Sequence, residues 1–362
     1  MLYQKNWDKV KERLLAIWEN EIIDRCCISV TAKIDRNKPW GMGKPAVTDE
    51  EIYNTYIDKE TVRGNWEAQF ANTYFAGDSF PVIWSNFGTA GHAKYFKGAQ
   101  YHWGKDTVWF DPSLTDDELD PGKLIFDPES PILKKELDTV SYLSEAGMGK
   151  YFVSLPDNCG CIDALAHLRG SAQLMYDMMD SPDEVKECIC KIVEAWKTTT
   201  KQFCDAIYKN NENGCCHGWM NSWSPCTHQQ LQVDFSVMIS PDMYEEFALP
   251  ELIATSESLG HAIYHLDGQE QIRHLDYILS VPNIRMIQWT PVAGQPRTST
   301  HLDALRRIQK SGRGLVLFPE VDEVETLLTE LSSKGLMLIV KGAKTPEEAD
   351  ALVKMAEKLT HE

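Results

Sequence analysis

The chain has 362 residues, of which 43% are hydrophobic and 25% charged, and its formal net charge at pH 7 is −18. This composition is typical of a globular protein and excludes a disordered one. The acidic excess opposes binding to nucleic acid or to an anionic membrane surface, because both need a basic face. No apolar stretch approaches the roughly 20 residues of a membrane helix, and charges interrupt residues 1–20, where a secretion signal would be apolar. We therefore expect a cytoplasmic protein whose partner is a small molecule or another protein.

Short β-rich runs alternate with helical patterns along the chain. Most of the intervening segments have apolar residues spaced three and four apart, which is typical of amphipathic helices. Such alternation predicts a parallel sheet covered by helices, and eight runs suggest a closed (β/α)8 TIM barrel. "TVWFDP", within the irregular region 85–130, is a candidate for an additional strand. In chain order, the eight runs cover residues 26–32, 78–84, 151–156, 214–220, 261–267, 284–290, 314–320 and 335–342.

We expect a single domain in two parts. Residues 1–75 would form an N-terminal extension and the first strand, packed on a barrel made by residues 76–362. The ten cysteines include no Cys-x-x-Cys pair, so a closed zinc site built from that motif is not predicted. A chain of this length in a reducing compartment needs no disulfide bonds, and we expect free thiols, most of them in the core.

In a (β/α)8 barrel the active site lies at the C-terminal ends of the strands. Trp219, Trp223 and Trp289 could line an apolar pocket for a flat ligand or pack in the core. Lys341 could meet an anionic group of a substrate or stay solvated at the rim. The polar and aromatic residues expected at this end are Asp157, His217, Trp219, Asn221, Trp223, His265, Asp267, Trp289, Glu320 and Lys341.

His265 and Asp267 are the strongest candidates for chemistry. They lie two residues apart at the end of an apolar run, so a strand would place both side chains on one face. Imidazole and carboxylate are ligands of zinc and similar ions, and a catalytic metal needs a third protein ligand. Glu320 is the predicted third ligand, with His217 in reserve. In the alternative interpretation, His265 forms rim hydrogen bonds, Asp267 caps a loop and Glu320 begins a helix.

Asp78 lies beside a glycine and an apolar run in "YFAGDSFPVIW". Burial raises the pKa of a carboxyl group and cationic neighbours lower it. This residue could therefore act as an acid, as a base or as an anchor for a positively charged group. The alternative is a cap at the entry of a strand. Both interpretations stay open at the level of sequence.

Several passages together resemble the uroporphyrinogen decarboxylase superfamily, and specifically its branch of corrinoid-linked methyltransferases. The resemblance spans roughly residues 70 to 355 and implies a (β/α)8 barrel with a deep cleft. The passages that carry it are "YFAGDSFPVIW", "LRGSAQLMYDMMDSPDEV", "VDFSVMISPDMYEEFALPEL", "YHLDG", "HLDYILSVPNIRMIQWTPVAGQ" and "KGAKTPEEADALV".

The chain departs from the motifs of this superfamily at two places, and both departures bear on which activity the resemblance implies. The decarboxylases carry an Arg-Gln-Ala-Gly-Arg segment that holds the substrate's carboxylates, and nothing like it follows "CCISVTA". The methyltransferases bind zinc through a His-x-Cys pair and a later cysteine, where this chain has His265-x-Asp267 and, near the later position, Glu320. Carboxylates in place of thiolates keep a divalent ion but harden its ligand set, which suits an oxygen-bearing substrate such as a methyl ether.

The resemblance therefore implies a zinc-assisted methyltransferase. It would move a methyl group between a small methyl donor or acceptor (an ether, amine or thiol) and a corrinoid carried by a separate protein. Asp78 would orient the substrate or exchange a proton. The alternatives are a metal-independent decarboxylase that uses Asp78, and a barrel that only binds a corrinoid or tetrapyrrole. Bound metal with methyl transfer, release of carbon dioxide, and tetrapyrrole binding without turnover would distinguish the three.

Overall fold

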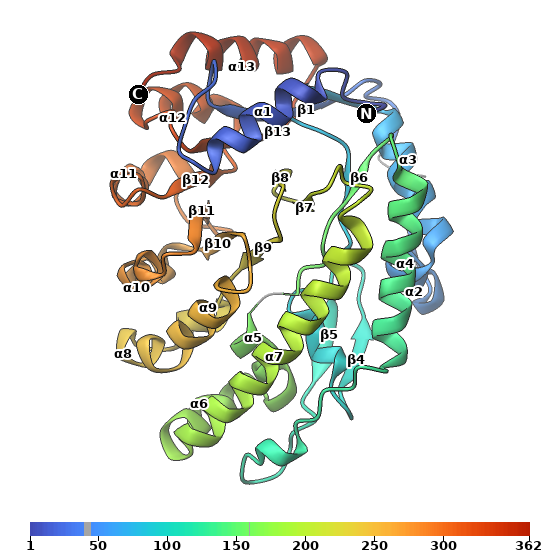
Figure 1. Ribbon diagram of the computed structural model, residues 1–362, viewed down its shortest axis with the longest axis vertical. Helices are drawn as coiled ribbons and strands as arrows, with labels where there is room; N and C mark the ends of the chain where they lie inside the picture. The colour runs from blue at the N-terminus through green and yellow to red at the C-terminus, as the bar shows by residue number, and fades with distance from the viewer. Residues whose placement is uncertain (40–44, 159) are drawn as a thin grey trace.

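The computed structural model describes residues 1–39, 45–158 and 160–362 (Figure 1). The fold is mixed α/β, with helices on the outside of an arc of strands. The helices are α1 (Trp7–Ile17), α2 (Asp49–Ile57), α3 (Lys59–Ala71), α4 (Pro131–Gly147), α5 (Cys161–Arg169), α6 (Ser171–Asp180), α7 (Pro182–Ile207), α8 (Pro241–Met243), α9 (Leu249–Ser256), α10 (Leu275–Ser280), α11 (Leu302–Lys310), α12 (Val324–Glu330) and α13 (Pro346–Leu359). The strands are β1 (Cys27–Lys33), β2 (Thr73–Gly77), β3 (Val82–Ile83), β4 (Gln100–Trp103), β5 (Val108–Asp111), β6 (Phe152–Val153), β7 (Cys215–His217), β8 (Ser222–Ser224), β9 (His228–Leu231), β10 (His261–Asp267), β11 (Ile284–Thr290), β12 (Gly314–Leu317) and β13 (Leu336–Ala343).

The main sheet has seven strands in the order β2-β1-β13-β12-β11-β10-β9. All its pairs are parallel except β1 with β2. The parallel sheet expected from the alternating pattern is therefore confirmed. β3 and β6 form a separate parallel pair, and the strand pairs of the described residues do not close into a barrel. The candidate strand in "TVWFDP" is β5, which forms an antiparallel hairpin with β4.

The two faces of the main sheet pack differently. Tyr264 and Leu266 of β10 belong to the large cluster between the strands and the helices. Ile263, on the opposite face, packs with Met286 and Met337 inside the arc of strands. Because side chains alternate along a strand, His265 and Asp267 share the inner face with Ile263.

α1 packs against the inner face of the main sheet, together with Cys216, Met220 and Trp223 of the β7–β8 hairpin. Within the run at residues 214–220, which was expected to be a strand of the parallel sheet, only Cys215–His217 forms a strand, and its pairing in the described structure is with β8 rather than with the main sheet. β7 pairs antiparallel with β8 through a turn in which Asn221 has a left-handed φ of 47°. β9 takes the place beside β10 instead. The polar sequence "HQQL" of β9 hides this strand, because it lacks an apolar alternation.

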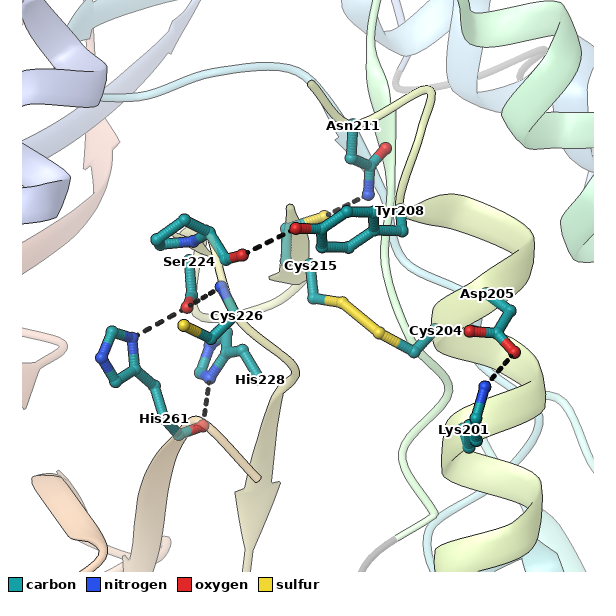
Figure 2. The surroundings of a disulfide bond; sticks show 12 residues. Lys201, Cys204, Asp205, Tyr208, Asn211, Cys215, Ser224, Cys226, His228 and His261 are labelled. Atoms are coloured by element: carbon teal, nitrogen blue, oxygen red, sulfur yellow. Dashed lines mark hydrogen bonds and ion pairs between the residues drawn. A yellow bond between two sulfur atoms is a disulfide. The ribbon is translucent and has the colours of Figure 1, made fainter. Parts of the chain in front are cut away.

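Cys204 and Cys215 form a disulfide bond, so the expectation of free thiols is wrong for this pair (Figure 2). The turn after α7 reverses the chain and brings the first residue of β7 back beside the last turn of the helix. Tyr208 adds a second link, because its hydroxyl donates a hydrogen bond to the carbonyl of Pro225 at 3.0 Å. The other described cysteines are free, and five of these seven are buried. Cys159 lies outside the described residues.

Among the residues that the structure describes, no helix is both long enough and apolar enough to cross a membrane.

Candidate metal centre and adjoining cavities

Three side chains with ligand atoms converge at neighbouring strand ends: Asp234, His265 and Asp267. One ligand atom from each lies within 4.8 Å of the other two. In the parallel pairing of β9 with β10, Leu231 is level with Tyr264. Asp234 and Asp267 each follow that level by three residues, so they leave the sheet side by side. Asp234 begins η3 (Asp234–Met238), the short helix after β9.

The geometry of this group fits a divalent ion. Zinc lies at about 2.0–2.2 Å from nitrogen and oxygen ligands, so two ligands of a tetrahedral ion are about 3.3–3.6 Å apart. The three ligand atoms lie within 4.8 Å of one another, so each side chain would need to move by less than about 1 Å to reach a shared ion. Oδ1 of Asp234 is buried and has no hydrogen-bond partner among the described residues. A buried carboxylate oxygen without a partner is costly, and a cation in this position would satisfy it.

Two glutamines orient the ligand atoms. His265 and Gln288 are paired across β10 and β11, and His265 Nδ1 donates a hydrogen bond to Gln288 Oε1. The amide nitrogen of Gln288 in turn donates to the hydroxyl of Thr290, which fixes the orientation of the amide. The proton of His265 is thereby held on Nδ1, so the lone pair on Nε2 is available to a metal. Gln232 donates to Oδ2 of Asp234 at 2.8 Å, which leaves Oδ1 for the ion.

A third carboxylate, Asp163 of α5, supports the loop that carries Asp234. It accepts hydrogen bonds from the backbone N–H groups of Asp234 at 3.0 Å and Phe235 at 2.7 Å. Burial raises the pKa of Asp163, and the charge of Asp234 raises it further. The pKa of Asp234 is raised by burial and by the charge of Asp267. A divalent cation would reverse this repulsion, because it would be the largest local charge.

Glu320 does not join this group in the described structure. It is exposed and precedes η7 (Val321–Glu323), where its N–H donates to the carboxylate of Glu323 at 3.0 Å. β12 ends at Leu317, and Phe318 is the following residue that reaches the interior cluster. Asp234 supplies the carboxylate that was expected from Glu320.

Asp78 lies at the opposite end of the sheet from the candidate metal centre. Its carboxylate accepts a hydrogen bond from the N–H of Ile28, near the start of β1. Arg25 contacts both of its oxygens, at 2.5 and 3.1 Å, and Arg13 contacts one of them at 3.0 Å. The side chain is fully buried. Two guanidinium groups and a strand N–H occupy the carboxylate, which agrees with the sequence alternative of an anchor for positively charged groups and favours a structural role over a catalytic one.

Of the three tryptophans predicted to line a pocket, only Trp219 lines the cavity described below, and Trp223 is buried in the interior cluster. The ring centroid of Trp219 lies 5.2 Å from those of His217 and His265 and 5.6 Å from that of Phe318. Trp289 directly follows Gln288 in β11, so its side chain points to the opposite face of the sheet. It packs in the outer cluster against the helices. His217 is fully buried behind Trp219, and burial holds its pKa well below the usual value. Its two ring nitrogens have no hydrogen-bond partner among the described residues, and it is not part of the ligand group.

A cavity of about 570 Å³ is lined by Trp219 but not by His265. Lys341 and Asn221 also line it. Asn221 exchanges two hydrogen bonds with the backbone of Phe80, at 2.8 and 3.2 Å, which ties the β7–β8 turn to the segment before β3. The predicted substrate-binding residues Trp219, Asn221 and Lys341 thus share one cavity, whereas His217 and Trp289 do not line it.

A second cavity, of about 430 Å³, adjoins the candidate metal centre at Asp234. Asp163 also lines it, together with Phe110 of β5 and His167 of α5, whose rings stack with centroids 4.4 Å apart. Met238, at the end of η3, completes a partly apolar wall. Of the two cavities, this one has a candidate metal ligand in its lining.

Asp234, Asp163 and Gln288 were not singled out from the sequence. One signal was present, because Gln230, Gln232 and Asp234 follow a period of two. These three side chains lie in one row that starts on the inner face of β9 and ends at the ligand group, and hydrogen bonds connect them. The signal is weak when all of its members are polar, since solvent-exposed loops show the same composition.

Comparisons with known proteins inform the fold. The sequence matches no protein-family model and no curated protein. A solved structure of a methyltransferase from Methanosarcina mazei is similar, with a TM-score of 0.56 over 96% of this chain and 98% of that chain. The two sequences are 12% identical, so the similarity concerns the fold alone.

Proposed function

We propose that the protein is a metal-dependent methyltransferase of the uroporphyrinogen decarboxylase superfamily, with its eight parallel strands arranged as a (β/α)8 barrel. It would move a methyl group between a small substrate and a corrinoid carried by a separate protein. The observation that carries this proposal is the group formed by Asp234, His265 and Asp267 at adjacent strand ends. The fold shared with a methyltransferase from Methanosarcina mazei supports it. A cytoplasmic location stays an expectation from the sequence.

The three residues would hold a divalent ion, for which zinc is our first candidate. When bound, such an ion supplies Lewis acidity that polarises a heteroatom of the substrate. Two carboxylates and one imidazole form a harder ligand set than one with thiolates, which favours an oxygen- or nitrogen-bearing substrate such as a methyl ether or amine. Gln288 keeps Nε2 of His265 unprotonated, and Gln232 keeps one oxygen of Asp234 free.

In this proposal the two reactants would occupy two cavities. The cavity beside Trp219 has a size suited to a small organic molecule. The cavity beside Asp234 gives a second approach, between β5 and η3. Two separate approaches suit transfer between two partners, because donor and acceptor must reach one reacting methyl group from opposite faces.

The decarboxylase alternative loses its main support. It relied on Asp78 to stabilise a protonated intermediate, and Asp78 is held by Arg13 and Arg25 near the start of β1. No specific contact in the described structure favours a barrel that only binds a tetrapyrrole.

The test is a methyl-transfer assay with reduced cobalamin and a panel of methyl ethers, amines and thiols. We expect a change of the cobalt absorption spectrum with at least one methyl donor, and loss of that change in His265→Ala and Asp267→Asn. Glu320→Gln is the matched control, because this carboxylate is exposed and outside the ligand group. No spectral change across the panel, with carbon dioxide released from a carboxylated compound, would replace the proposal by the decarboxylase.

A further inference from the structure

The cavity beside Trp219 has an unusual charge composition. Four basic side chains line it, Lys33, Arg36, Lys341 and Lys344, and its lining contains no Asp or Glu. The whole chain, by contrast, has 54 acidic and 36 basic residues. A concentration of one charge against the net charge of the protein favours a ligand of the opposite charge. The four cations come from the C-terminal ends of β1 and β13 and the segments that follow them, which lie side by side.

Two aromatic rings connect Lys341 to the residues beside the candidate metal centre. Its ammonium group lies 5.3 Å from the ring centroid of Phe318, which in turn packs against Trp219. The side chain is exposed and lines the cavity, and the protein around it lowers the pKa of Lys341 by partial desolvation. Among the described residues, no carboxylate forms an ion pair with Lys341, Arg36 or Lys344. An anion in the cavity would supply the counter-charge that these cations lack.

Two residues of the lining carry neutral donors. Ser29, on the inner face of β1, and Trp84, just after β3, line the cavity, but Ser29 Oγ and Trp84 Nε1 are enclosed by protein and have no hydrogen-bond partner among the described residues. The basic side chains are therefore the charged groups that the cavity offers to an anion.

The rest of the wall is apolar and aromatic. Trp66 of α3, Trp84 and Trp219 contribute indole rings, and Phe75 and Phe80 contribute phenyl rings. Flat aromatic surfaces of this kind pack against an aromatic or alkyl body. Trp219 separates the cavity from His265, with a centroid separation of 5.2 Å between their rings. A ligand here would lie one aromatic ring away from the candidate metal centre.

We propose that this cavity binds a small organic anion, whose carboxylate, sulfonate or phosphonate group is held by Lys341 and the neighbouring cations of the lining. Its aromatic or alkyl body packs on Trp66, Trp84 and Trp219. The role of this anion as the methyl substrate rests on the function proposed above. Its binding does not, because none of the metal-ligand candidates lines the cavity.

The test compares para-methoxybenzoate with its neutral isostere para-methoxybenzamide, with tryptophan fluorescence and calorimetry as readouts. We expect saturable binding of the acid and binding of the amide that is weaker by about ten- to hundredfold, the size of one charged hydrogen bond. Lys341→Met should weaken binding of the acid by a similar factor and leave that of the amide unchanged. Lys334→Met is the control, since Lys334 is ion-paired with Glu362 at 3.3 Å and lies outside the cavity.

Equal affinities for acid and amide, or an unchanged affinity in Lys341→Met, would overturn the proposal. So would the absence of saturable binding for para-methoxybenzoate, benzenesulfonate and phenylphosphonate at millimolar concentrations. His265→Ala separates this proposal from the proposed function. If the variant binds the acid as the wild type does while no methyl donor changes the cobalt spectrum of the wild type, the anion site stands and the methyltransferase falls.

Discussion

Replacing Gln288 with leucine should weaken metal binding without touching a ligand. Gln288 is fully buried, and its Oε1 is the acceptor for Nδ1 of His265. Leucine would leave the Nδ1–H group unpaired, so the imidazole could take the other tautomer or rotate. An unpaired buried donor costs about 1–3 kcal/mol, and loss of an outer-shell partner typically lowers metal affinity about 10- to 100-fold. These two magnitudes agree, because 1.4 kcal/mol corresponds to a factor of about ten.

The assay is a competition titration with a chromophoric zinc chelator, and Gln229→Leu is the matched control. Gln229 is also buried and donates a hydrogen bond to the carbonyl of Pro156 at 2.9 Å, but it has no contact with His265. Both variants should lose some stability, whereas only Gln288→Leu should lose metal affinity. Gln288→Glu should keep it, because a carboxylate also accepts the Nδ1–H bond. If Gln288→Leu bound zinc as tightly as the wild type while Asp267→Asn did not, the tautomer argument would be refuted.

Three further predictions concern stability. Burial lowers the pKa of His92 and His228 to about 3, so the folded state stays neutral there while the unfolded state takes up protons near pH 6.5. Stability should therefore be lost as the pH falls below about 6.5, by about 2–3 kcal/mol per histidine at pH 4.5, and urea titrations of His228→Gln should show a smaller loss. Asp78→Asn should destabilise the fold by about 3–5 kcal/mol in urea and leave the metal content unchanged, since it leaves buried Arg25 without its counter-charge. Cys204→Ser should cost about 2–3 kcal/mol, because the disulfide closes a loop with a sequence separation of 11; a thermal midpoint that dithiothreitol leaves unchanged in the wild type would contradict this.

The position of His265 and Asp267 on one face could be predicted from their spacing, because side-chain alternation along a strand is a local property. The register between strands is not local. Trp219 and Trp289 look alike in the sequence, yet the structure buries Trp289 under the outer helices and places Trp219 beside His265. The pairing of β10 with β11, which sets Gln288 against His265, decides the face that Trp289 takes, whereas Trp219 is carried by the turn between β7 and β8.

The third carboxylate could not be predicted, because β9 was not recognised as a strand. Its inner face carries glutamines, so the apolar pattern that reveals buried strands is absent. Asp78 shows the converse problem. An acid beside an apolar run is compatible with chemistry and with an ion pair, and only the approach of Arg13 and Arg25 from distant segments distinguishes them. The same holds for Cys204 and Cys215, whose pairing depends on the turn after α7.

The most direct test of the metal centre is element analysis of the purified protein by mass spectrometry. We predict about one divalent ion per chain in the wild type, most of it lost in His265→Ala and in Asp234→Asn, and all of it retained in Glu320→Gln. The Asp234→Asn variant is decisive, because it separates the group seen in the structure from the one expected from the sequence. A wild-type protein without stoichiometric metal after reconstitution with zinc, or one that loses its ion in Glu320→Gln but keeps it in Asp234→Asn, would contradict the account.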